Sequence, residues 1–123
     1  MSGYNASAID DLPTLWDGFA KLVRAGLDIR AFGVNIMDLP ADYETKSHAE
    51  TESGQEELYI ALRGSGAVVI GDERVPLDAE HLVAVAPETE RVLASGGDGL
   101  RVLIVGGKPG AAYEPQDWSS AGE

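Results

Sequence analysis

A histidine and several glutamates stand together in residues 48–66, beside an apolar run. The stretch reads HAETESGQEELYIALRGSG and contains His48, Glu50 and Glu57. Imidazole nitrogens and carboxylate oxygens are protein ligands of Mn, Fe and Zn. The same groups can instead hold a small polar molecule through hydrogen bonds. No other part of the chain offers a comparable set, so this stretch is the candidate site.

The apolar run after these glutamates alternates as a β-strand does. Successive side chains of a strand point to opposite faces, so Glu57 and Tyr59 share one face. If that face lines a barrel, Glu57 is a carboxylate in a partly dry space, which is costly unless a cation or hydrogen-bond donors compensate it. We therefore expect a partner for Glu57. Tyr59 either fills the barrel or contacts a ligand, whereas Glu52 and Glu56 are expected to be solvated.

Short apolar runs separated by turn residues continue from residue 29 to residue 107. They are IRAFGVNIM, ELYIAL, AVVI, RVPL, LVAVA, RVLAS and LRVLIVG. This texture predicts an all-β domain of about seven or eight short strands, too many for one small open sheet, and therefore a barrel or sandwich. Glycines predict tight hairpins at Gly71-Asp72 and at residues 96–99. The stretch RGSG at residues 63–66 is also expected to be a turn.

The two ends of the chain differ from this central part. Apolar residues recur at three- and four-residue spacing over residues 12–23, with Pro13 near the start and Gly26 after the end, which predicts one helix. The tail has loop composition, but Tyr113 and Trp118 indicate that it packs back, onto the barrel or a partner subunit. We predict an N-terminal helical extension over residues 1–28, a barrel over residues 29–107 and a tail over residues 108–123.

The charge of the chain limits its partners. Its 123 residues hold nine Lys and Arg against 21 Asp and Glu, a formal net charge of −12. This field repels nucleic-acid phosphates and anionic bilayers, so we expect neither as a partner. The sequence contains no cysteine, which excludes disulfides and fits a reducing compartment. With no signal-peptide pattern or long apolar run, the chain is predicted to be soluble and cytoplasmic.

Two segments resemble the sequence motifs of the cupin superfamily. Glu57, followed after six residues by Gly64, is similar to the second half of the first motif, whose first half is a His-x-His pair. Residues 77–91, LDAEHLVAVAPETER, are similar to the second motif, in which a turn, an apolar strand and a proline precede the last metal-binding histidine. The resemblance covers residues 29–107 and is to small single-domain cupins of the cupin 2 conserved barrel type. It implies an all-β double-stranded β-helix, or jelly-roll barrel, with a site in its mouth.

The chain departs from the cupin pattern at the metal-binding positions. Metal-using cupins hold their ion with three histidines and one glutamate, and only His48 and Glu57 stand at matching places. Glu50 takes the place of the second histidine, and Arg91, four residues after Pro87, takes that of the last. A guanidinium is always protonated and offers no lone pair, so Arg91 cannot bind a cation. We predict an ion pair between Arg91 and Glu57 in place of the metal. His81 is expected to be a surface turn residue.

Two functions remain open. The preferred one is a cupin without a metal or other cofactor that binds a small molecule, neutral or anionic, in the barrel mouth. Its predicted ligand contacts are Arg91, Glu57, Tyr59, His48 and Gln55, with Arg91 available to an anionic group. The alternative is a metal-dependent cupin enzyme, an isomerase or dioxygenase, that holds Mn, Fe or Zn with His48, Glu50 and Glu57. A homodimer is expected, because small cupin barrels leave an apolar outer sheet face.

Overall fold

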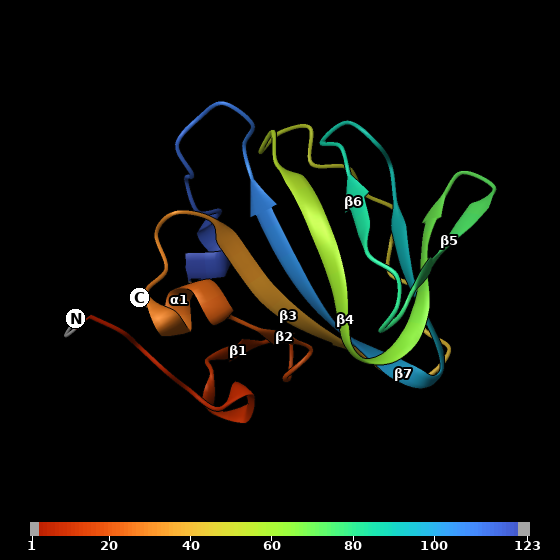
Figure 1. Ribbon diagram of the computed structural model, residues 1–123, viewed down its shortest axis with the longest axis horizontal. Helices are drawn as coiled ribbons and strands as arrows, with labels where there is room; N and C mark the ends of the chain where they lie inside the picture. Colours follow the sequence, from red (N-terminus) through yellow and green to blue (C-terminus); the bar gives the residue numbers. More distant parts are fainter. Residues whose placement is uncertain (1–2, 121–123) are drawn as a thin grey trace.

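The protein is a curved antiparallel barrel, with short helical elements near the N-terminus and the C-terminus of the chain (Figure 1). The computed structural model describes residues 3–120. The strands are β1 (Thr14–Leu15), β2 (Ala20–Lys21), β3 (Gly33–Leu39), β4 (Glu56–Ile70), β5 (Glu73–Leu77), β6 (Val83–Val85) and β7 (Val92–Gly107). The helices are the 3-10 turns η1 (Ile9–Asp11) and η2 (Asp117–Ser120) and the α-helix α1 (Val23–Leu27). No helix among the described residues is long and apolar enough to cross a bilayer.

Two long strands organise the barrel. The strand order is β1-β2-β3-β7-β4-β5, with β6 paired to the first half of β4 on the edge away from β7, and all pairs are antiparallel. β4 and β7 pair along both of their halves, so they hold the two ends of the barrel together. The all-β jelly-roll architecture predicted from the sequence, with one α-helix near the N-terminus, is confirmed.

The middle of β4 and β7 bends where the sequence predicted two turns. The register passes from Gly64 opposite Leu100 to Gly66 opposite Ser95, so residues 96–99 face a single residue of β4. A β-carbon on Gly66 would overlap the carbonyl oxygen of Ala94. The predicted hairpin at 96–99 and the predicted turn at 63–66 are therefore wrong, because the glycines form a large bulge that lets both strands bend without ending. The other predicted hairpin, at Gly71-Asp72, is present between β4 and β5.

The N-terminal segment contains much less helix than predicted. Residues 14–21 form a small hairpin, and only Val23–Leu27 is α-helical. Trp16 and Asp17 adopt left-handed backbone angles, with φ of 55° and 57°, which a right-handed helix does not allow. The helical spacing misled because its apolar residues do not share one face: Phe19 packs against the inner core, whereas Leu12 packs in a second cluster.

Two apolar clusters lie on opposite faces of the main sheet. The inner cluster fills the barrel and includes Tyr59, Val68, Leu77 and Val102. The outer cluster joins the N-terminal segment to the outside of β3 and β7, through residues such as Leu12, Val23, Val34 and Ile36. The N-terminal segment therefore covers the outer face of the sheet at β3 and β7.

The C-terminal tail packs back onto its own barrel. Trp118 of η2 stacks on Trp16, with ring centroids 5.6 Å apart. Arg24 of α1 donates a hydrogen bond of 3.1 Å to the backbone oxygen of Ser119. The ring of Tyr113 lies against Gly33, where a β-carbon would come within 3.0 Å of it. These contacts place η2 beside α1 at the open end of the barrel (Figure 1).

Candidate functional site

The inward face of β4 supplies the base of the site. Glu57 and Tyr59 point into the barrel, as the alternation predicted, and Tyr59 is fully buried. Across the sheet Glu57 pairs with Gly106 of β7, which in turn pairs with Gly33 of β3. Because the two glycines have no side chains, the Gln55 amide oxygen and the Tyr113 ring can lie directly against this row of the sheet, beside Glu57.

Arg91 forms the predicted ion pair with Glu57. Its Nη2 lies 3.0 Å from Oε1 of Glu57, and its Nε donates to the hydroxyl of Tyr59 at 3.1 Å. The Tyr59 hydroxyl donates to the same Glu57 oxygen at 2.7 Å. Burial and the neighbouring Glu57 charge raise the pKa of Tyr59, so Tyr59 stays protonated and keeps donating to Glu57 at neutral pH.

Arg91 also donates to the backbone. Nη1 donates to the carbonyl of Thr89 at 2.8 Å and to that of Ala86 at 3.4 Å. Arg91 is 0% exposed and is not among the residues that line the cavity beside Glu57. This geometry supports the structural role predicted for Arg91 and gives no support to its predicted contact with an anionic ligand.

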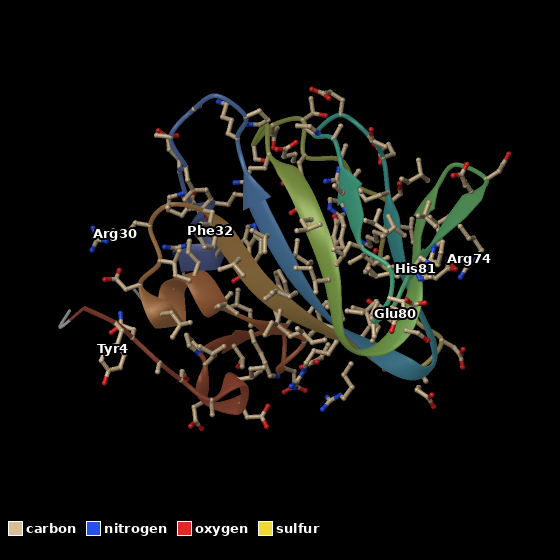
Figure 2. All side chains as sticks on the ribbon, in the orientation of Figure 1. Tyr4, Arg30, Phe32, Arg74, Glu80 and His81 are labelled. Carbon is tan, nitrogen blue, oxygen red and sulfur yellow. The ribbon has the colours of Figure 1, made fainter. Side chains whose placement is uncertain are left out.

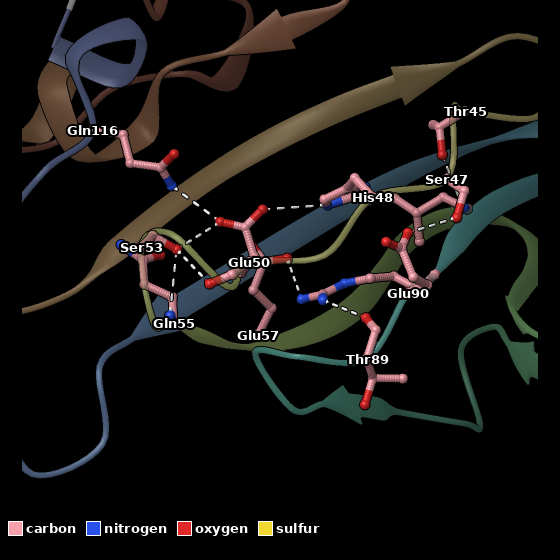
Figure 3. Close-up of polar contacts among 12 residues, drawn as sticks. Thr45, Ser47, His48, Glu50, Ser53, Gln55, Glu57, Thr89, Glu90 and Gln116 are labelled. Carbon is pink, nitrogen blue, oxygen red and sulfur yellow. Dashed lines mark hydrogen bonds and ion pairs between the residues drawn. The ribbon is translucent and has the colours of Figure 1, made fainter.

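A second polar cluster faces Glu57 from the loop before β4. Nε2 of His48 lies 3.4 Å from Oε2 of Glu50. The other Glu50 oxygen accepts hydrogen bonds from Ser53 at 2.8 Å and from Gln116 of the tail at 3.3 Å (Figure 3). His48 is fixed by an isolated bridge to Arg91, with paired backbone hydrogen bonds of 3.0 and 2.9 Å. Gln116 of the tail thus contacts the predicted site at Glu50.

These residues satisfy the cupin metal pattern only in part. One ligand atom from each of His48, Glu50 and Glu57 lies within 4.8 Å of the other two, close enough to surround one ion. The fourth ligand position of the family holds Arg91, whose charge already neutralises one Glu57 oxygen. The four-ligand centre therefore does not fit this chain, and only a three-ligand acidic variant does.

A cavity of about 160 Å³ lies above this base, inside the mouth of the barrel. Its walls are mainly apolar, and the tail closes one side of it with Tyr113 and Trp118. The side chains at its polar end come from the loop, from β4 and from β3: His48, Glu50, Gln55, Glu57 and Asn35. A mainly apolar pocket with a few convergent polar groups is the usual form of a small-molecule site.

The sequence-predicted site residues divide into two groups. His48, Gln55, Glu57 and Tyr59 line the cavity together, as does Glu50 of the metal alternative, whereas Arg91 lies behind it. Sequence reasoning missed the cavity residues Asn35, Phe19 and Gln116. Asn35 carried a weak signal, since it is a polar residue inside an otherwise apolar strand. Phe19 and Gln116 reach the cavity only because the hairpin and the tail fold over the barrel mouth.

The three residues that were expected to be solvated, outside the site, lie on the surface. His81 is exposed and contacts Asp78 with Nδ1 at 2.8 Å, in the turn before β6 (Figure 2). The hydrogen bond from His81 is the main cause that lowers the pKa of Asp78. Glu52 and Glu56 are exposed, as predicted. None of these three predicted surface residues lines the cavity.

Known structures share this fold. Neither a protein-family model nor a curated protein matches the chain by sequence. A cupin protein from Bacteroides fragilis is similar with a TM-score of 0.71 at 22% identity, over 94% of this chain and 93% of the other. An RmlC-like cupin from Desulfovibrio desulfuricans gives 0.63 at 17% identity, over 83% and 94%. A predicted oxalate decarboxylase from Thermotoga maritima gives 0.56 at 22%, over 70% and 74%. The chain therefore has the cupin fold.

Proposed function

We propose that this cupin-fold protein binds a small organic molecule in the cavity at its barrel mouth, without a metal ion. The observation that carries the proposal is the buried ion pair between Arg91 and Glu57. It stands where the cupin resemblance implies a metal and its last histidine ligand. A fixed guanidinium beside Glu57 compensates the carboxylate from inside the protein, so the carboxylate needs no metal ion.

The form of the cavity supports binding of an organic ligand. Apolar walls bury the body of a small molecule, and the polar groups at one end orient it. The volume, about 160 Å³, is close to that of a cavity of about 150 Å³ that holds benzene. A ligand with one six-membered ring, or an aliphatic body of similar size, therefore fits.

Thermal unfolding with and without metal tests the proposal. A ligand that binds only the folded state stabilises it by about 2.7 kcal/mol at a hundredfold excess over its dissociation constant. We expect the melting temperature of the native protein to stay unchanged with micromolar Mn, Fe or Zn. A melting temperature that rises by many degrees, or a stoichiometric transition metal in protein purified without chelator, would overturn the metal-free proposal.

A metal-dependent enzyme is the second candidate, favoured by the three ligand atoms that lie within 4.8 Å of one another. In that case His48, Glu50 and Glu57 would hold Mn or Fe, which prefer carboxylate-rich sites over softer ones. The double variant Glu50→His, Arg91→His serves as the positive control of the metal experiment. It removes the resident charge and restores three histidines and one glutamate, so its melting temperature should rise with added metal.

A further inference from the structure

The charged groups of the cavity are acidic. Glu50 and Glu57 line it, together with the titratable ring of His48. No lysine or arginine is among the lining residues that the structure describes, and the guanidinium of Arg91 points into the protein behind Glu57. Arg91 compensates Glu57 through Oε1, so the charge that repels an anionic ligand and attracts a cationic one is mainly that of Glu50.

Asn35 adds an independent sign of what the cavity receives. This residue of β3 is 9% exposed, and its Oδ1 is buried without a hydrogen-bond partner in the described residues. It lines the same cavity, in the sheet row that continues through Ile104 to Tyr59. Buried acceptors without a partner are rare and costly, because the group loses water and gains nothing. A ligand that donates a hydrogen bond to Oδ1 removes this cost.

The aromatic walls suit the same ligand. Phe19, Tyr113 and Trp118 contribute ring surface to the cavity. Aromatic faces attract cations through their quadrupole, and they also pack well against an apolar ring or chain. The cavity thus combines acceptors and negative charge at one end with aromatic surface around the remainder.

We propose that the ligand is a small protonated primary or secondary amine with an apolar body of about one ring. The inference rests on the proposed function, that the cavity binds a small molecule, and it names the chemical class. The ammonium group is held at the carboxylate of Glu50, beside the Arg91-compensated Glu57, and an N–H or a second donor of the ligand reaches Asn35. The apolar body lies against the aromatic walls.

Four probes of similar size and different charge test the class of ligand. Binding of benzylamine, benzyltrimethylammonium, benzyl alcohol and benzoate is measured by calorimetry at pH 7 with EDTA, where the amine is protonated as lysine is. We expect benzylamine to bind at least about tenfold more tightly than benzyl alcohol and benzoate. The quaternary probe should bind more weakly than benzylamine, because it has charge but no N–H to donate.

The probes separate failure of this inference from failure of the proposed function. If benzyl alcohol or benzoate binds as well as benzylamine, the amine class is wrong and small-molecule binding stands. If benzyltrimethylammonium matches benzylamine, the cavity selects charge alone, and the donor role assigned to Asn35 is wrong. If none of the four probes binds, both the amine class and the proposed cavity function are contradicted.

Matched variants test which residues of the cavity bind the amine. Glu50→Gln should weaken benzylamine at least about tenfold, while Glu52→Gln, an exposed neighbour outside this cavity, should leave its affinity unchanged. Asn35→Leu should also weaken benzylamine, and it should raise the melting temperature of the free protein because it removes the unpaired oxygen. Equal affinities in the Glu50→Gln, Glu52→Gln and native proteins would overturn the inference.

Discussion

At the scale of single residues, Arg91 does the most to keep the site intact. It is fully buried and contacts Glu57, Tyr59 and two backbone carbonyls. Arg91→Ala should lower the free energy of unfolding by about 3 kcal/mol or more, because Glu57 is left as an uncompensated carboxylate. Urea denaturation measures the loss. Arg74→Ala, at an exposed arginine of β5, is the matched control and should change stability by no more than about 0.5 kcal/mol.

A second substitution tests whether the loss comes from the pair. Adding Glu57→Gln to Arg91→Ala removes the stranded charge, so the double variant should recover part of the lost stability. If the double variant is as unstable as the sum of the two single variants, the residues do not act as a pair.

Sequence could predict this pair but not all of the residues around it. Arg91 was identifiable because a cation stands where the cupin resemblance implies a histidine ligand for the same metal as Glu57. Asn35 and Gln116 reach the cavity through strand register and through docking of the tail. Neither contact follows from local spacing, so neither residue was expected.

At the scale of elements, Asp38 joins three strands. Its carboxylate accepts a hydrogen bond from Arg101 of β7 at 2.7 Å and lies 2.9 Å from Nζ of Lys21 of β2. Burial alone would raise the pKa of Asp38, but the hydrogen bonds and charges of Arg101 and Lys21 outweigh it and lower the pKa. The N-terminal hairpin is therefore held to the barrel by an ionised carboxylate.

This shift gives a pH dependence of defined sign. Because the folded-state pKa of Asp38 lies below the unfolded value of about 3.9, its contribution is present above that pH and is lost as the pH falls through the folded-state pKa. Asp38→Asn should cost about 1–2 kcal/mol at pH 7, and less at pH 2–3, in urea denaturation. Asp72→Asn, in the exposed β4–β5 turn, is the control. A loss from Asp38→Asn that is the same at both pH values would contradict this role.

The bend in β4 and β7 makes a prediction about two glycines. A β-carbon at Gly66 would overlap the backbone of β7, whereas one at Gly97, in the bulge opposite, would contact nothing within 4 Å. Gly66→Ala should therefore lower the melting temperature strongly, by the equivalent of about 2 kcal/mol or more, because backbone must move. Gly97→Ala should change it little. Similar melting temperatures for the two variants would show that the strands tolerate displacement at the bend.

The glycine-containing stretches also show where local sequence signals fail. Gly71-Asp72 and residues 96–99 carry similar turn chemistry, yet the first is a hairpin and the second is a bulge inside β7. In the first, the strands on both sides pair with each other, as they do in an ordinary hairpin. In the second, both sides pair with the same long strand β4 instead. Both stretches contain glycine and therefore predict a turn. Whether a hairpin or a bulge forms depends on which strand pairs with the flanking residues.

At the scale of the whole molecule, the two chain ends occupy surfaces that could otherwise receive a partner. The N-terminal segment covers the outside of β3 and β7, and the tail covers the barrel mouth. Exposed leucines stand on the outer face of β4 and directly before β6, with Leu62 44% and Leu82 64% exposed. The partly buried Leu58 and Ile60 lie on the same outer face of β4. An apolar sheet face of this kind is typical of an interface between protein subunits.

We expect a second copy of the chain to cover this face, as the sequence already suggested. Two copies that each carry a formal charge of −12 repel one another, so the dimer should strengthen as salt screens the charges. Sedimentation analysis at micromolar concentration should show a dimer that weakens at low ionic strength. Leu82→Asp should give monomers at all salt concentrations, while Tyr4→Asp, at an exposed aromatic of the N-terminal segment, should leave the dimer intact. A monomer at high salt, or a dimer that survives Leu82→Asp together with Leu62→Asp, would exclude this face as the interface.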